Sequence, residues 1–120
     1  MVRKTEAGEQ VALFQWAELT ERRYPPLRLM YHIPNGGRRD VVSGAHLKAQ
    51  GVKAGVPDIC LPVARGEYHG LYIELKAAEG KTTSDAQRKW ITALRRQCYR
   101  VVVCYGFEEA KDEIEHYLKM

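Results

Sequence analysis

The spacing of hydrophobic and polar positions along the chain predicts helices and strands in alternation. Apolar residues recur three or four positions apart over residues 6–23, 84–97 and 107–118, which is the period of a helix that packs on one side. Residues 40–50 give a weaker helix prediction that ends at a glycine. Short apolar runs bounded by turn residues predict strands over four segments, namely 27–33, 58–63, 70–76 and 100–105.

The predicted order of elements, α-β-α-β-β-α-β-α, indicates an α/β fold with a four-stranded mixed sheet flanked by helices. A short turn at Arg65-Gly66-Glu67 joins the strands 58–63 and 70–76, so we expect these two strands to form a hairpin. The segment 70–105 has the length of a parallel strand–helix–strand crossover. The length of 120 residues suits one core, so residues 1–120 are interpreted as a single domain.

Composition excludes several classes of protein. Hydrophobic residues make up 45% and charged residues 28% of the chain, as in folded globular domains and unlike disordered segments. No apolar run reaches the roughly 18 residues of a membrane span, and the polar start is unlike a signal peptide, so we expect a cytoplasmic protein that does not contact membranes. Cys60, Cys98 and Cys104 lack the spacing of a disulfide framework or a zinc site, and we expect all three to be buried.

Charge is unevenly distributed along the chain. The net charge is +4, and residues 22–53 hold seven Lys or Arg residues against one acid, Asp40. A local basic excess is typical of a surface that binds a polyanion. It is equally compatible with a solvated basic surface, and charge alone leaves both interpretations open.

Two acids and a lysine converge on one edge of the predicted hairpin. Asp58 begins one strand and Glu74 ends the next, and antiparallel pairing brings the start of one strand beside the end of the other. Alternation along a strand puts Glu74 and Lys76 on one face and Leu75 on the other. This grouping suits metal-assisted phosphodiester hydrolysis, in which carboxylates bind Mg²⁺ or Mn²⁺ and a lysine neutralises charge on the phosphate. The alternative is a turn residue after Pro57 and an ordinary exposed ion pair.

Gln87 lies one turn before Trp90 on the apolar face of the helix 84–97. Its amide could face the two carboxylates and hold a water or Lys76. It could also close a capping box with Ser84, in which the glutamine side chain binds the N–H of the residue that begins the helix. Both roles remain open from the sequence.

Several short motifs carry a likeness to a known family. They are Glu9-Gln10, His32–Gly37, Gly51–Asp58, Gly70–Lys76, and Gln87 with Trp90. The sequence resembles the VRR-NUC family, the compact branch of the PD-(D/E)XK nuclease superfamily, over nearly its whole length. The resemblance implies a restriction-endonuclease-like core and a DNA endonuclease that depends on Mg²⁺ or Mn²⁺. Stand-alone members of this size look like phage or prophage proteins that act in the bacterial host on branched DNA such as four-way (Holliday) junctions.

The resemblance also implies roles for individual residues. Asp58 and Glu74 match the two metal-binding carboxylates, and the carbonyl of Leu75 would be a further metal ligand. Lys76 matches the motif lysine, and Gln87 matches the glutamine of the following helix. Glu9 matches the acid of the first helix, with Glu6 as the alternative one turn earlier.

The family pattern places a loop beside the active site that would contact DNA. The candidate DNA-binding residues are His32, Asn35, Arg38, Arg39 and Lys53. From the residues alone, His32 could instead be a hydrogen-bonded histidine at a strand end, and Lys53 a solvated lysine.

A surplus of apolar residues in the first half of the chain predicts a homodimer. These residues are Trp16, Tyr24, Leu27, Leu29, Tyr31, Val41, Val42, Ala45 and Leu47. A two-fold dimer presents two identical sites, as two cuts in a four-way junction require. Three alternatives stay open: a monomer that uses these residues in its own core, a catalytically idle nucleic-acid binder, and a dimeric interaction module without nucleic acid.

Overall fold

The computed structural model describes residues 5–34, 41–77 and 81–120. The elements follow the predicted order with one addition, a 3₁₀ helix: α1 (Glu6–Thr20), η1 (Pro25–Leu29), β1 (Tyr31–His32), α2 (Val41–Ala49), β2 (Ile59–Leu61), β3 (Leu71–Lys76), α3 (Asp85–Arg96), β4 (Arg100–Tyr105) and α4 (Phe107–Leu118). The predicted α/β class is therefore confirmed. Over the described residues, no helix is both long and apolar enough to cross a lipid bilayer.

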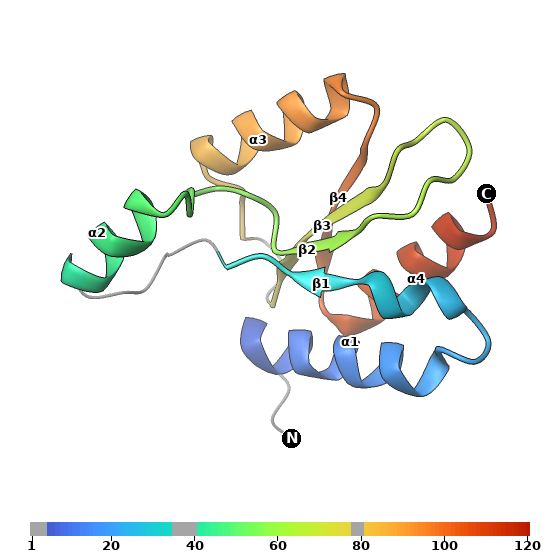
Figure 1. Ribbon diagram of the computed structural model, residues 1–120. Coiled ribbons are helices and arrows are strands. Elements are labelled where there is room, and N and C mark those ends of the chain that lie inside the picture. Colours follow the sequence, from blue (N-terminus) through green and yellow to red (C-terminus); the bar gives the residue numbers. More distant parts are fainter. Residues whose placement is uncertain (1–4, 35–40, 78–80) are drawn as a thin grey trace.

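The four strands form one mixed sheet in the order β1-β2-β3-β4 (Figure 1). β2 pairs antiparallel with β1 and with β3, and the register places Ile59 opposite Ile73. β4 runs parallel to β3, with Cys104 beside Leu75. Both the predicted hairpin and the predicted parallel crossover through α3 are present.

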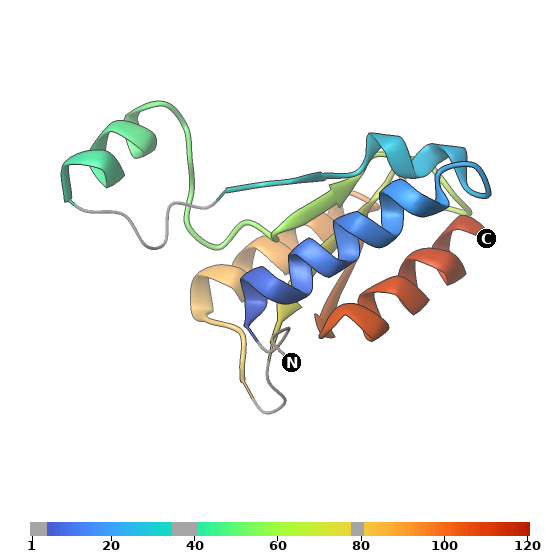
Figure 2. The same ribbon diagram turned by 90° about the horizontal axis from the view of Figure 1, so that it is seen from below.

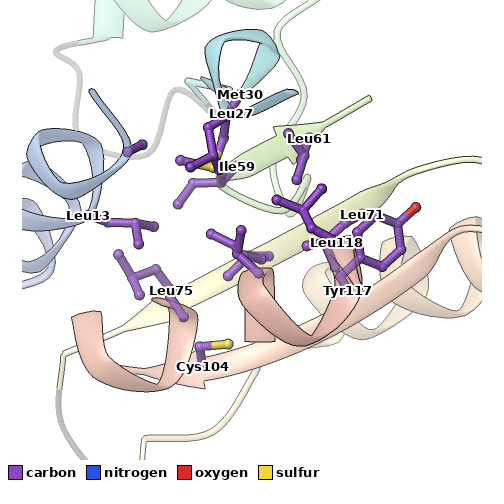
Figure 3. Close-up of a cluster of buried hydrophobic side chains, with 14 residues drawn as sticks. Leu13, Leu27, Met30, Ile59, Leu61, Leu71, Leu75, Cys104, Tyr117 and Leu118 are labelled. Carbon is purple, nitrogen blue, oxygen red and sulfur yellow. The ribbon is translucent and has the colours of Figure 1, made fainter. Parts of the chain in front are cut away.

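The helices form two layers on the sheet. Figures 1 and 2 show α1 and α4 on one face and α3 on the other. The apolar core lies between the sheet and the α1–α4 layer, and Figure 3 shows its side chains meeting there. Along β3, Leu71, Ile73 and Leu75 are buried in this core, so by alternation Tyr72, Glu74 and Lys76 face the α3 side. The strand thereby separates packing residues from polar ones.

The segment after α1 differs from its prediction. Residues 27–33 were expected to form one strand, but Pro25 and Pro26 begin the 3₁₀ helix η1 and only Tyr31–His32 pair as a strand. A proline ring holds φ near the helical value and lacks an N–H, so it favours the first positions of a helical turn over a strand. The turn buries Leu27 in the core and leaves Leu29 52% exposed.

Two further positions are more exposed than expected. Val11 is one of the apolar residues within the predicted helix 6–23, but it is exposed. Cys98 is also exposed, while Cys60 and Cys104 are buried as predicted. Cys98 has a positive φ of 67° just past α3, where Tyr99 N–H donates to the Leu94 carbonyl. This is the left-handed turn that closes many helices, and it directs the Cys98 side chain away from the core.

β4 is an edge strand, and two of its outward backbone groups are bound by side chains. The Arg95 guanidinium donates to the carbonyl of Val101 at 2.7 Å. The N–H of Tyr105 donates to the Glu109 carboxylate at 2.8 Å. Both ends of the edge are thus occupied by side chains from α3 and α4.

Candidate active site

Asp58 lies directly before β2, where its carboxylate reaches the end of β3. Its Oδ2 accepts the N–H of Leu75 at 2.8 Å, and its carbonyl accepts the N–H of Ile33 at 2.6 Å. The side chain is therefore held across the sheet by a backbone donor of the neighbouring strand. The predicted hairpin placed Asp58 beside the end of the strand that carries Glu74, and the structure has this arrangement.

Glu74, Lys76 and Gln87 form one hydrogen-bonded group beside Asp58. Gln87 Nε2 donates to Glu74 Oε2 at 2.8 Å, and Lys76 Nζ donates to Gln87 Oε1 at 3.0 Å. The distance between Lys76 Nζ and Glu74 Oε2 is 3.6 Å. Gln87 thus holds the carboxylate and the ammonium with the two ends of one amide.

Gln87 serves both roles that the sequence left open. Its Oε1 also accepts the N–H of Ser84 at 2.9 Å, while its own N–H donates to the Ser84 hydroxyl at 3.1 Å. These two bonds are the capping box that begins α3. Because the helix start and the polar group share one side chain, the first turn of α3 is fixed relative to β3.

The charged groups at this place are buried. Asp58 is 9%, Glu74 2% and Lys76 7% exposed. Burial, reinforced by the charge of Asp58 and opposed by Lys76, raises the pKa of Glu74 to about 8. Burial also raises the pKa of Asp58, while the N–H of Leu75 opposes the shift. At this place burial therefore disfavours the ionised form of both carboxyl groups.

One carboxylate oxygen has no partner. Glu74 Oε1 is the buried side-chain oxygen without a hydrogen bond among the described residues. An unpaired carboxylate oxygen beside a second carboxylate fits a hard divalent cation such as Mg²⁺. Over the described part of the chain, no group of three or more His, Cys, Asp or Glu residues could hold a metal ion. A cation here would take its remaining ligands from carbonyls, waters or phosphate, as Mg²⁺ commonly does.

The two candidate acids of the first helix have different surroundings. Glu9 Oε1 accepts the N–H of Phe107 at 2.7 Å, so this carboxylate caps the start of α4. The negative charge of Glu6 acts on both Asp58 and Glu74 and raises the pKa of each. Glu9 thus has a partner within the protein, because a helix terminus with unpaired N–H groups binds its carboxylate. The assignment of Glu9 as the metal-binding acid, with Glu6 as the alternative, stays a prediction.

The expected DNA-contact residues are only partly brought to the site. His32 Nδ1 lies 3.0 Å from the carbonyl of Asp58, which is the hydrogen-bonded strand-end histidine considered above. Lys53 is exposed in the loop before Asp58. Asn35, Arg38 and Arg39 lie outside the described residues.

Gly55 has a role that the motif alone did not reveal. It is buried with φ of 91°, and a Cβ there would lie 2.7 Å from the backbone carbon of Ala86. Only glycine permits both that backbone conformation and that close approach. The loop that carries Lys53 and leads to Asp58 is therefore pressed against the first turn of α3. In the sequence, the glycine two positions before Pro57-Asp58 was the feature that could have indicated this close approach.

Comparisons with known proteins agree with this geometry. The family model of the VRR-NUC domain matches residues 3–108. A solved structure described as a VRR_NUC domain protein is 32% identical, covers 96% of this chain and 88% of its own, and superposes with a TM-score of 0.80. No curated protein matches. The chain belongs to the VRR-NUC domain family, which makes it a nuclease of the PD-(D/E)XK type.

Proposed function

We propose that the chain is a metal-dependent DNA endonuclease with Asp58, Glu74, Lys76 and Gln87 as its active site. One observation carries the proposal: two buried carboxylates adjoin an ammonium, and one carboxylate oxygen, Glu74 Oε1, has no partner among the described residues. Burying charged groups is costly unless another group compensates them. A divalent cation and a phosphate supply that compensation.

In the proposed site, Asp58, Glu74 and the Leu75 carbonyl hold Mg²⁺ or Mn²⁺, with Glu6 near enough to add negative charge. When bound, the cation polarises the scissile phosphate and lowers the pKa of a water. Lys76 then faces the phosphate with its ammonium and stabilises the charge that develops there. Because the Gln87 amide binds both groups, it fixes the position of the Lys76 ammonium relative to the Glu74 carboxylate.

DNA would reach this site along the basic segment 22–53. His32 lies against Asp58, and Lys53 lies two residues from the Gly55–Ala86 contact. We assign Asn35, Arg38 and Arg39 to the same DNA-binding surface on the strength of their charge and their place in the family motif. Each contact with a phosphate adds to the salt dependence of binding.

We further propose a homodimer that acts on branched DNA, as in stand-alone nucleases of the phage type. α2 has nine residues, and Figures 1 and 2 show it set apart from the sheet and the other helices. A helix this short is marginal in water without a packing partner, and a second copy is the partner that we infer. Leu29 and Tyr31 also remain about half exposed, whereas Leu27 belongs to the core.

A panel of labelled linear, flap, splayed and four-way DNA, incubated with Mg²⁺, Mn²⁺ or EDTA, tests the proposal. We expect cleavage only with metal, and faster cleavage of the four-way junction than of linear duplex. Light scattering at micromolar concentration should give twice the mass of the 13.7 kDa chain. Equal cleavage in EDTA would exclude the metal site. A mass of one chain would exclude the preformed dimer but leave the nuclease assignment intact.

Binding without any cleavage, in every metal, would favour the catalytically idle nucleic-acid binder instead. Absence of retention on a DNA resin at low salt would favour the interaction module without nucleic acid. Against both alternatives, Asp58, Glu74 and Lys76 are all present and all brought together.

A further inference from the structure

α3 has two faces of different chemistry. The inner face carries Gln87 to the active site and buries Ile91 against the sheet. The remaining surface carries four basic residues, Arg88, Lys89, Arg95 and Arg96, against a single acid, Asp85. This basic surface lies outside the segment 22–53, so it is a second region of positive charge.

The outer face of α3 is hollowed. A depression of about 420 Å³ is lined by Asp85, Arg88, Lys89, Thr92, Ala93 and Arg96. Residues three and four apart share one side of a helix, so these six follow one another along the axis. Thr92 and Ala93 have short side chains and form the low middle of the depression. Long cationic side chains stand at both ends.

Two of the cations in the depression are not neutralised by the protein. Arg88 pairs with Asp85, so these two charges largely cancel. Among the described residues, neither Lys89 nor Arg96 makes an ion pair, and both are exposed. Seven residues of helix separate them, which is about 10 Å along the axis. About three successive phosphates of one DNA strand cover that axial distance.

The depression is joined to the active site by rigid contacts. Gln87, in the first turn of α3, binds Glu74 and Lys76, and Ala86 touches Gly55 in the loop that leads to Asp58. Lys89 is therefore two residues from the side chain that orders the catalytic group. The basic surface of α3 therefore belongs to the helix that covers the Glu74 side of the sheet.

We propose that the outer face of α3 binds the phosphate backbone of the DNA arm that continues from the scissile phosphate, with Lys89 and Arg96 as its two principal contacts. This inference rests on the proposed nuclease function and names a DNA-binding surface for it. The short Thr92 and Ala93 let the backbone approach the helix, and the Thr92 hydroxyl offers a donor to a phosphate oxygen.

The test compares two double variants that each remove two positive charges. Lys89→Ala with Arg96→Ala removes the proposed contacts. Lys111→Ala with Lys119→Ala removes the same number of charges from α4 and the residue directly after it, and α4 covers the opposite face of the sheet. Binding to a labelled four-way junction and to a linear duplex is measured in EDTA from 50 to 200 mM salt, so that no cleavage intervenes.

We expect the α3 double variant to bind about tenfold more weakly at 50 mM salt. The slope of log K against log salt should fall by about 1.8, since each phosphate contact contributes about 0.9. In cleavage assays with Mg²⁺, KM should rise while kcat at saturating DNA stays within about twofold. The control variant should match the wild type in slope and in KM.

An unchanged slope in the α3 variant, while wild-type protein binds and cleaves DNA, would overturn this inference and leave the nuclease function standing. A reduced slope with no cleavage by the wild type would support DNA binding by α3 and overturn the nuclease function. If the α3 double variant melts below the wild type, Ala93→Glu is tested by the same criteria, because it places a carboxylate inside the depression without removing a long side chain.

Discussion

The two faces of the sheet bury different kinds of side chain. Beneath α1 and α4, Ile73 and Leu75 of β3 join an apolar cluster (Figure 3). On the α3 side, Glu74 and Lys76 of the same strand are buried as charged groups. Adjacent residues therefore belong to environments in which burial has opposite consequences for stability.

The difference shows how a domain of this size holds a destabilising site. The α1–α4 face buries apolar surface, which favours folding. The α3 face buries two carboxylates that repel each other and lose their hydration, which opposes folding. Because one short strand contributes to both faces, variants of neighbouring residues on β3 can separate stability from chemistry.

The largest expected effect is on the charged face. Asp58→Ala, Glu74→Ala or Lys76→Ala should each lower cleavage by at least about 100-fold, since each removes a proposed metal ligand or the charge proposed to act on the phosphate. DNA binding in EDTA should be retained. Rates are measured with excess enzyme on a labelled junction. Near wild-type cleavage by any of the three would show that the assignment of the site is wrong.

On the apolar face the expectation is reversed. Ile73→Ala should lower the free energy of unfolding by about 3 kcal/mol, because it leaves a cavity in the core. Its cleavage rate per folded molecule should stay close to that of the wild type. Urea unfolding measures the first quantity, and single-turnover cleavage at low temperature measures the second. A large loss of rate with little loss of stability would contradict the division between the faces.

Gln87 connects α3 to the charged face, and its two roles can be separated. Gln87→Ala should lower cleavage about 10- to 100-fold, as the loss of groups that orient metal-site residues commonly does. Ser84→Ala removes only the helix cap and should cost about 1 kcal/mol of stability with cleavage nearly unchanged. If the two variants have the same effect on cleavage, Gln87 acts only as a cap.

The buried charge should give the metal-free protein a characteristic pH dependence. The pKa of Glu74 rises from 4.5 to about 8 on folding, so the folded state holds this proton more tightly than the unfolded state. Stability should therefore fall as pH rises from about 4.5 to 8. Glu74→Gln should remove this fall and be the more stable protein at pH 9. Thermal melting in EDTA at pH 6 and pH 9 measures both, and a parallel change in the two proteins would contradict the origin in Glu74.

The smallest effects distinguish the two glutamates of α1. Glu9→Gln should lower stability by about 1 kcal/mol, because a neutral amide caps α4 less well than a carboxylate. Glu6→Gln should leave stability unchanged or higher and raise the Mg²⁺ concentration needed for half-maximal cleavage. An exchange of these two outcomes would identify Glu9 as the acid of the site.

Local patterns predicted the centre of the site because its geometry is local. Asp58, Glu74 and Lys76 lie on one hairpin, where strand alternation and a short turn determine which side chains meet. The position of Gln87 in the first turn of the next helix could be predicted from the capping-box sequence that begins with Ser84. Two of these four residues lie on a single strand, so few long-range contacts had to be foreseen.

Positions that depend on distant contacts were not predictable in the same way. Glu9 binds the N–H of Phe107, 98 positions away, and no pattern within α1 shows that partner. Pro25 and Pro26 precede the segment 27–33 that was expected to form a strand, and they begin a turn that buries Leu27 instead. Cys98 was expected to be buried, yet the left-handed turn after α3 exposes it.

The side chains that bind the edge of β4 bear on how the protein behaves at high concentration. An exposed strand edge is a template on which another chain can add a strand, and such addition leads to aggregation. Arg95 and Glu109 occupy the outward carbonyl of Val101 and the outward N–H of Tyr105, so an incoming strand would have to displace both. At the other edge, β1 is only two residues long. Strand addition is thus disfavoured at both edges of the sheet, so we expect the protein to resist polymerisation through its strands at high concentration.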